Sequence, residues 1–231
     1  LSKTPIPRWI RIKQSCQIEL HGFCDASEKA YGAMIYSVVT QEDGKIDVSL
    51  LIAKTRVAPL KSMSLARLEL LAIHCLTKLY AYVCEALRSP IENIHLWSDS
   101  TIALSWISKP SSTWKTFVRN RVQEIHDIAS PNRFHYCPTV DNPADDLTRS
   151  ISLEELTKKC TYWNGPTWLR EGKDQWPFIL FIYFILSTYQ MLRRHRLLNR
   201  IKGGTIAITI ICVKDMIHFS KFKVAIKELD D

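Results

Sequence analysis

Four acidic residues in this 231-residue chain stand where secondary structure would bring them together: Asp25, Glu69, Asp99 and Asp145. In-line hydrolysis of a phosphodiester needs an activated water and a stabilised leaving oxygen, and two divalent cations about 3.5–4 Å apart provide both. Such cations need several hard oxygen ligands, and four converging carboxylates without cations would repel one another. Any one of these acids alone would be interpreted as a turn, cap or solvent-facing residue. Together they predict a metal-dependent site.

The expected secondary structure places the four acids at junctions between elements. Apolar and polar periodicity predicts strands at Gln17–Phe23, Tyr31–Thr40, Val48–Val57, Ile94–Trp97 and Phe134–Cys137. Helices are expected over residues 64–87, 98–107, 114–129 and 142–149. Asp25 and Asp99 then follow strands, Asp145 lies at the start of a helix, and Glu69 lies in the first turns of the long helix. Functional groups in open α/β sheets gather at such junctions.

This order of elements, βββ-α-β-α-α-β-α, predicts an α/β fold with a mixed five-stranded sheet flanked by helices. The domain is expected to end near residue 150, because the pattern after it is less regular. Residues 162–169 are expected to form an aromatic-rich loop. Phe178–Leu186 is a run of nine apolar residues, shorter than the roughly 20 that a membrane span needs. We expect it to be a buried helix, with membrane attachment as the alternative.

The chain is basic, with 31 Lys and Arg against 23 Asp and Glu and a formal net charge of +8. Such a charge suits a polyanionic partner or simply keeps the surface solvated. In the helix expected at 114–129, Lys115 and Arg119 are four residues apart and therefore share a face. We expect this face to contact phosphates, the alternative being a solvated surface.

Seven cysteines form no Cys-x-x-Cys pair, which disfavours a zinc ribbon. The odd number also disfavours a disulfide framework and fits free thiols in a reducing compartment. The first residues contain neither an initiator Met nor the apolar core of a signal peptide, so the chain is expected to be a piece of a longer one.

Several motifs resemble the ribonuclease H region of BEL/Pao-type LTR retrotransposon polyproteins. The motifs are His21-Gly-Phe-Cys-Asp-Ala-Ser-Glu-Lys-Ala-Tyr-Gly-Ala33, Arg67-Leu-Glu-Leu-Leu-Ala72, Trp97-Ser-Asp-Ser-Thr101 and Asp141-Asn-Pro-Ala-Asp-Asp-Leu-Thr-Arg149. Ile6-Pro-Arg-Trp9, Trp163-Asn-Gly-Pro166 and Trp176-Pro177 also look like that family, so the resemblance covers about residues 5–177. Asp145 rather than Asp146 corresponds to the fourth acid, because Arg149 stands four residues after it.

The resemblance implies a ribonuclease H-like fold and hydrolysis of the RNA strand of an RNA–DNA hybrid during reverse transcription. In the family, Asp25, Glu69, Asp99 and Asp145 would hold two Mg²⁺ ions, for which Mn²⁺ can substitute. Ser98, Ser100 and Arg149 would position the site or the substrate. The reverse transcriptase and integrase regions of the same polyprotein are the implied partners, and an intracellular location, a cytoplasmic virus-like particle or the nucleus, is implied as well. The alternative is an inactive ribonuclease H-like module that only binds nucleic acid or acts as a spacer.

Two features depart from the family pattern. Family members often place a histidine two residues before the proline that follows the last strand, and here that place is held by Tyr136, with His135 beside it. If the histidine assists product release, this chain turns over slowly. The tail resembles the family's helical connector toward integrase with a shortened middle, as deletion or frame damage in a decaying copy would produce. The expected organisation is a linker at 1–16, the domain at 17–152, an aromatic-rich connector at 153–177 and a basic extension at 178–231.

Overall fold

The structure is a computed structural model that describes residues 17–87, 91 and 93–177. Its sheet has five strands: β1 (Gln17–Ala26), β2 (Ala30–Thr40), β3 (Ile46–Val57), β4 (Asn93–Ser98) and β5 (Phe134–Tyr136). The strand order is β3-β2-β1-β4-β5. The first three strands pair antiparallel, whereas β4 lies parallel to β1 and β5 lies parallel to β4. The expected mixed five-stranded sheet is thereby confirmed.

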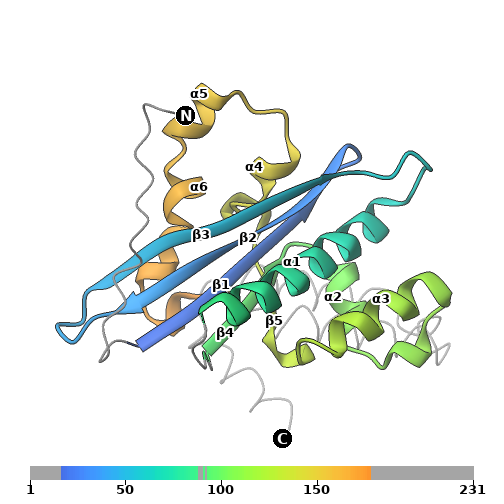
Figure 1. Ribbon diagram of the computed structural model, residues 1–231, viewed down its shortest axis with the longest axis horizontal. Helices are drawn as coiled ribbons and strands as arrows, with labels where there is room; N and C mark the ends of the chain where they lie inside the picture. The colour runs from blue at the N-terminus through green and yellow to red at the C-terminus, as the bar shows by residue number, and fades with distance from the viewer. Residues whose placement is uncertain (1–16, 88–90, 92, 178–231) are drawn as a thin grey trace, which may run out of the picture. The chain divides into compact units, whose positions relative to one another are not determined.

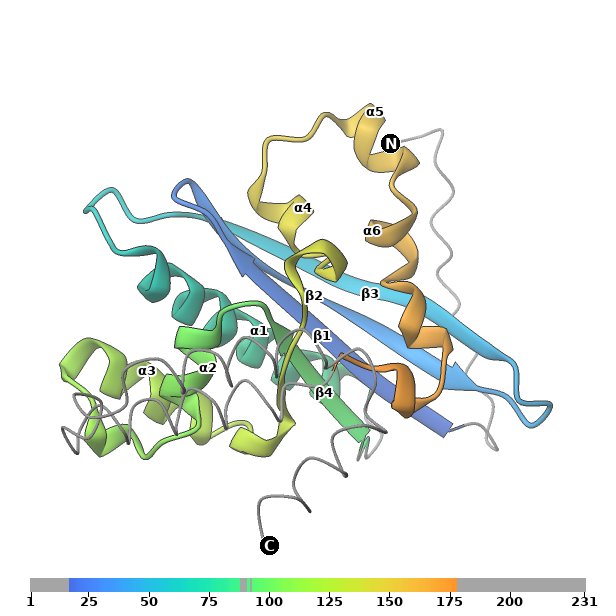
Figure 2. The ribbon, with the colours of Figure 1, turned by 180° about the vertical axis from the view of Figure 1, so that it is seen from behind.

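Helices cover both faces of this sheet (Figures 1 and 2). On one face lies α1 (Leu65–Leu87), with α2 (Thr101–Ile107) and α3 (Thr116–His126) beside it. On the other face lie α4 (Asp145–Thr148) and α6 (Cys160–Asn164), joined through α5 (Leu153–Lys158). Short 3-10 helices occur at Ser111–Thr113, Pro131–Arg133, Thr139–Asp141, Thr167–Arg170 and Lys173–Gln175.

The long helix α1 is the main cover of one sheet face. Its apolar stripe is buried there, including Leu68, Leu76 and Leu79. It approaches the sheet closely at Gly22, where a Cβ atom would lie 2.6 Å from Leu76 Cδ1. By length and composition α1 is apolar enough to cross a membrane, but 56% of its most apolar window is buried in the fold. Its apolar character is therefore that of a core helix.

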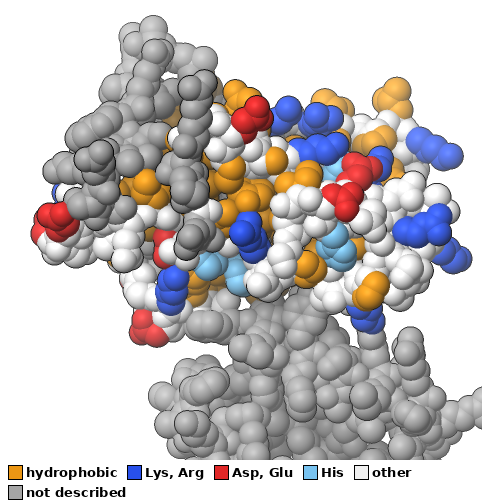
Figure 3. All heavy atoms as spheres, turned by 60° about the horizontal axis from the view of Figure 1, so that its bottom comes forward, with side chains coloured by type: hydrophobic (Ala, Val, Ile, Leu, Met, Phe, Trp, Pro, Cys, Tyr) orange, Lys and Arg blue, Asp and Glu red, His pale blue; other side chains and the backbone are white. Residues whose placement is uncertain are grey.

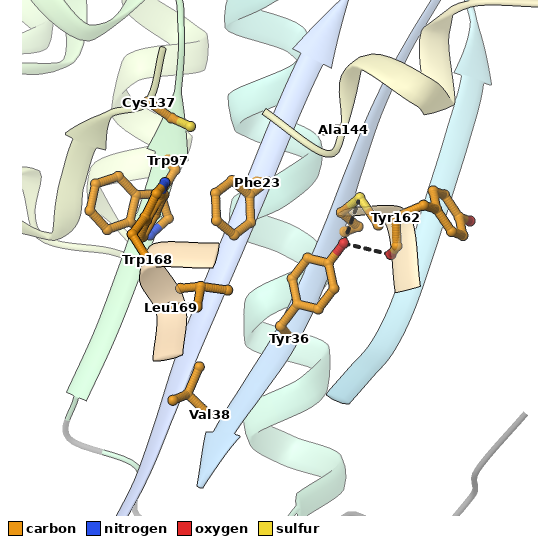
Figure 4. Packing of buried hydrophobic residues seen from close by; sticks show 10 residues of the cluster. Phe23, Tyr36, Val38, Trp97, Cys137, Ala144, Tyr162, Trp168 and Leu169 are labelled. Atoms are coloured by element: carbon orange, nitrogen blue, oxygen red, sulfur yellow. Dashed lines mark hydrogen bonds between the residues drawn. The ribbon is translucent and has the colours of Figure 1, made fainter. Parts of the chain in front are cut away.

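The opposite face carries an aromatic core (Figure 4). Phe23 and Trp97 stack at 6.2 Å between ring centroids, and Trp168 packs on Trp97 at 4.8 Å. The Tyr36 hydroxyl donates a hydrogen bond of 2.7 Å to the carbonyl oxygen of Tyr162. The expectation of a loop over residues 162–169 was wrong: this segment holds the end of α6 and a 3-10 helix. Its aromatic side chains form a regular packed layer because the sheet face beneath them is itself aromatic.

Three helices are shorter than expected, and the one expected at 142–149 is helical only over Asp145–Thr148. The helix expected at 98–107 begins only at Thr101, because Ser98 still belongs to β4 and Ser100 caps the helix by accepting from the Ala103 amide. The amphipathic segment 114–129 is helical only over Thr116–His126. Five described cysteines are free, at positions 24, 75, 84, 137 and 160. The predictions for residues 1–16 and 178–231, the apolar run Phe178–Leu186 included, lie outside the described residues.

Candidate active site

The parallel pairing of β1 and β4 brings Asp25 and Asp99 to the same end of the sheet. Cys24 pairs with Ser98 across these strands, and each acid is the next residue in its chain. The carboxyl ends of parallel neighbours lie side by side, so the two side chains leave the sheet from adjacent positions. The proximity of Asp25 and Asp99 follows from the register between β1 and β4, and the order of the strands alone does not determine that register.

Asp25 is nearly buried, with 9% of its surface exposed. Burial raises the pKa of its carboxyl group to about 6, a hydrogen bond from Thr148 opposes that rise, and the negative charges of Asp99 and Asp145 add to it. The Thr148 hydroxyl lies 2.5 Å from Asp25 Oδ2. Burial and the neighbouring negative charges therefore both disfavour the anionic form of Asp25.

Glu69 on α1 is connected to the segment that carries Asp99, between β4 and α2, through Ser100. The Ser100 hydroxyl donates to Glu69 Oε2 at 2.5 Å, which ties α1 to the start of α2. Burial raises the pKa of Glu69, and the Asp99 charge raises it further. Burial also raises the pKa of Asp99, while a 2.9 Å hydrogen bond from Thr139 lowers it and the Asp145 charge raises it. Each of the four predicted acids is thus electrostatically coupled to at least one other: Asp25 to Asp99 and Asp145, Glu69 to Asp99, and Asp99 to Asp145.

The two neighbouring aspartates of α4 face different surroundings. Asp145 is the one whose charge reaches Asp25 and Asp99, and it pairs with Arg149 Nε at 2.8 Å. Asp146 instead forms an ion pair with Lys159 and is 9% exposed. The geometry therefore brings Asp145, the residue that the Asp-x-x-x-Arg spacing selects, into the acidic cluster.

The other predicted site residues differ in accessibility. Ser98 and Ser100 are buried, at 3% and 4% exposure. The Ser98 hydroxyl accepts a hydrogen bond from the Ser100 amide at 3.2 Å, and the Ser100 hydroxyl donates one to Glu69. Both serines therefore fix the backbone and the side chains around the acids. Lys115 and Arg119 are exposed, with Lys115 at the N-cap of α3. Their contact with phosphate stays a prediction.

Tyr136 occupies the place where family members often carry a histidine. Burial raises the pKa of its phenol, and so does the Asp99 charge, which puts this side chain within electrostatic reach of the acids. His135 cannot take over that place, because its ring packs against Trp97 at 4.9 Å and its Nε2 lies 3.2 Å from His95 Nδ1. Adjacent residues of a strand point to opposite faces.

A second group of side chains has the composition of a metal site. Among the described residues, Glu19, His21 and His95 bring possible ligand atoms within 4.8 Å of one another. The Trp97 indole donates to His21 Nδ1 at 3.2 Å, which leaves the ring proton on Nε2, 3.3 Å from Glu19 Oε2. Glu19 also pairs with Lys173 at 3.2 Å. His21 and Glu19 are thus already bonded to each other, to Trp97 and to Lys173, and we interpret the group as part of the packing of the sheet rather than as a metal site.

Residues that the sequence motifs did not single out support the acids. Thr148 and Thr139 each donate to one aspartate, and Asn142 donates to the carbonyl oxygen of Cys24 at 3.0 Å. Thr148 and Asn142 stand inside the quoted motif Asp141–Arg149. Their position within that motif was the signal by which the sequence could have identified Thr148 and Asn142. Their bonding partners could not be identified in this way, because each of the two bonds spans more than a hundred residues.

Comparison with solved structures finds ribonucleases H at low identity. RNase H1 from the archaeon Halobacterium salinarum NRC-1 is 12% identical, with a TM-score of 0.34, 62% of this chain covered and 98% of that chain. The N-terminal RNase H domain of a Mycobacterium tuberculosis protein is 15% identical, with a TM-score of 0.35 and coverage of 58% and 91%. LC11-RNase H1, determined in complex with an RNA/DNA hybrid, is 16% identical, with a TM-score of 0.36 and coverage of 56% and 92%.

The sequence itself matches a family model. No curated protein matches this chain. Residues 2–100, which carry the motifs with Asp25, Glu69 and Asp99, match the model described as Pao retrotransposon-like RNaseH-like domain. The match covers less than half of the 231-residue chain and shows a similarity to that family over these residues.

Proposed function

We propose that this domain is a metal-dependent ribonuclease H that cleaves the RNA strand of an RNA–DNA hybrid during retrotransposon reverse transcription. The observation that carries the proposal is the convergence of Asp25, Glu69, Asp99 and Asp145, each of which is within electrostatic reach of another acid in the group. The sequence motifs that hold them resemble those of the ribonuclease H region of Pao-type elements, and the family match over residues 2–100 covers three of the four acids.

The residues present fit divalent cations. The pKa of three of the acids is raised by burial and by neighbouring negative charge, and Arg149 is the cation that pairs with the cluster among the described residues. Four hard carboxylates with so little compensation form the donor set that Mg²⁺ or Mn²⁺ prefers. Asp25, Glu69, Asp99 and Asp145 would hold the ions. When bound, two such ions would activate water and stabilise the leaving oxygen.

The chain's own residues prepare this site. Thr148, Thr139 and Ser100 each donate to one carboxylate and fix its orientation before any cation arrives. Arg149 holds Asp145 while remaining 64% exposed, which leaves its guanidinium free to reach a phosphate. Lys115 and Arg119 on α3 would contact the hybrid backbone. Contacts to phosphates and sugars tolerate any base sequence, as such an activity requires.

The test is cleavage of an end-labelled RNA–DNA hybrid by the full chain, followed on a denaturing gel. Cleavage is expected with Mg²⁺ or Mn²⁺ and absent in EDTA, and Asp99→Asn is expected to reduce the rate by at least about a thousandfold. The matched control is Asp127→Asn, an exposed residue just past α3, which should cleave like wild type. Metal-independent cleavage would refute the mechanism. Hybrid binding with no cleavage under any metal condition would favour an inactive binding module.

A further inference from the structure

A groove lies between the edge strand β3 and helix α1. It has a volume of about 340 Å³, and it is lined by Ile52, Ala53, Lys54, Arg56, Cys75, Lys78, Leu79 and Tyr82. The groove exists because α1 packs on β1 and β2, which leaves this side of β3 beyond the helix uncovered. Its floor is apolar, with Cys75 and Leu79 less than a tenth exposed.

Cations rim this apolar floor. Lys54 and Arg56 alternate along β3, so both project to the side on which α1 lies, and both are exposed. Neither forms an ion pair with any residue in the described part of the chain, whereas Lys78 lies 3.5 Å from Glu124. Over the wider surface, Lys and Arg side chains gather toward one side of the face in Figure 3, interspersed with hydrophobic side chains.

An aromatic ring completes the groove. Tyr82 stands one turn after Lys78 on α1 and is 60% exposed, which is unusual for a large ring in a helix that is otherwise buried on its apolar face. A positively charged groove that follows a backbone, combined with an exposed aromatic ring, is the arrangement by which proteins hold single strands without reading their sequence. An acidic peptide would pair with Lys54 and Arg56 but would not need the ring of Tyr82.

The groove is separate from the acidic cluster but close to it. Lys54 and Arg56 flank Thr55, which pairs through Gly32 with Asp25, so they lie two strands from that acid, or about 10 Å. Along α1, Lys78 follows Glu69 by nine residues, or about 14 Å. Side chains alternate along a strand, and Thr55 and Asp25 both contact the α4 segment, so Lys54 and Arg56 project from the opposite face of the sheet and form a surface distinct from that acid.

We propose that the groove between β3 and α1 binds a single nucleic-acid strand, with Lys54 and Arg56 on its phosphates and Tyr82 against a base. This binding does not require the four acids or a divalent cation. It adds a sequence-independent contact outside the hybrid contacts assigned to Arg149, Lys115 and Arg119.

The test is fluorescence anisotropy of labelled oligothymidylate, about 12 nucleotides long, with the full chain in EDTA. The double variant Lys54→Ala/Arg56→Ala is expected to weaken binding about tenfold and to lower the slope of log affinity against log salt by about 1.4. The matched control, Lys45→Ala/Lys158→Ala, removes the same charge at two exposed positions on the β2–β3 turn and α5, and should bind nearly as wild type does.

The aromatic contact has its own pair of variants. Tyr82→Ala is expected to weaken binding about fivefold or more, while Tyr82→Phe should retain it, because the ring and not the hydroxyl stacks. Unchanged affinity in Lys54→Ala/Arg56→Ala, or an equal loss in the charge-matched control, would overturn the proposal. Competition by polyglutamate as effective as that by unlabelled oligothymidylate would overturn it as well. Loss of hybrid cleavage with retained single-strand binding would count only against the proposed nuclease activity.

Discussion

The Thr148 hydroxyl donates a hydrogen bond to Asp25 Oδ2 at 2.5 Å, across a separation of 123 residues. Thr148 is 6% exposed and lies in the same short helix as Asp145. One bond therefore connects the end of β1 to the helix that carries the fourth acid. It stabilises the anionic form of Asp25 against burial and against the charges of Asp99 and Asp145.

Replacing Thr148 by Val should raise the pKa of Asp25 above its value of about 6, because the bond that lowers it is lost while the shape is kept. Carbon-detected NMR of the Asp25 carboxyl group in EDTA measures that pKa directly. Thr148→Ser keeps the donor and is expected to leave the pKa near the wild-type value. An unchanged pKa in Thr148→Val would show that the hydroxyl does not support the carboxylate.

Glu19 gives a prediction for the pH dependence of stability. The hydrogen bond to His21 lowers its pKa to about 2, burial opposes this, and Lys173 adds to the lowering. A carboxyl whose pKa is lowered in the folded state stabilises that state above the unfolded pKa of about 4.5, and this contribution is lost as the pH falls toward 2. Glu19→Gln should therefore reduce the free energy of unfolding by about 1 kcal/mol at pH 7.

The deficit of Glu19→Gln should shrink as the pH is lowered from about 5 to 3, which urea unfolding at several pH values measures. Glu154→Gln removes a surface pair with Lys158 and serves as the control, with an expected cost below about 0.5 kcal/mol. A deficit that stays constant across this pH range would contradict the assigned ion pair.

Tyr136 offers a test of turnover that rests on the proposed nuclease activity. A partly buried phenol near Asp99 stays neutral at pH 7, because burial and that charge both raise its pKa. Tyr136→His would place a group that titrates near neutral pH beside the acids. We expect a severalfold higher steady-state rate with an unchanged single-turnover rate, since only product release is affected. Tyr136→Phe should leave both rates as they are, and a raised single-turnover rate in Tyr136→His would exclude this explanation.

Trp168 tests how far the aromatic segment after α5 contributes to the fold. It is 6% exposed and packs on Trp97 and Phe23. Trp168→Ala should lower the free energy of unfolding by about 3–5 kcal/mol, as measured by urea unfolding. Leu153→Ala, at a residue that is 50% exposed, should change it by less than about 0.5 kcal/mol. Equal effects would mean that the segment beyond residue 160 adds little to the core.

The sequence by itself determined the strands, the long helix and the resemblance to a family, because each rests on local signals. Alternation in Gln17–Phe23 and the repeat of apolar residues after Ser64 are both periodicities that a short window contains. The motif spacing also selected Asp145 over Asp146, and the structure brings Asp145 into the acidic cluster.

Only the tertiary structure decided which side chains meet. Three features join segments that are far apart in the chain. They are the register that pairs Cys24 with Ser98, the bond between Thr148 and Asp25, and the groove between β3 and α1. Likewise, residues 162–169 carry loop-like turn residues, yet they form a packed aromatic layer because an aromatic sheet face lies beneath them. Local propensity cannot contain such contacts, since burial and partners are properties of the folded chain.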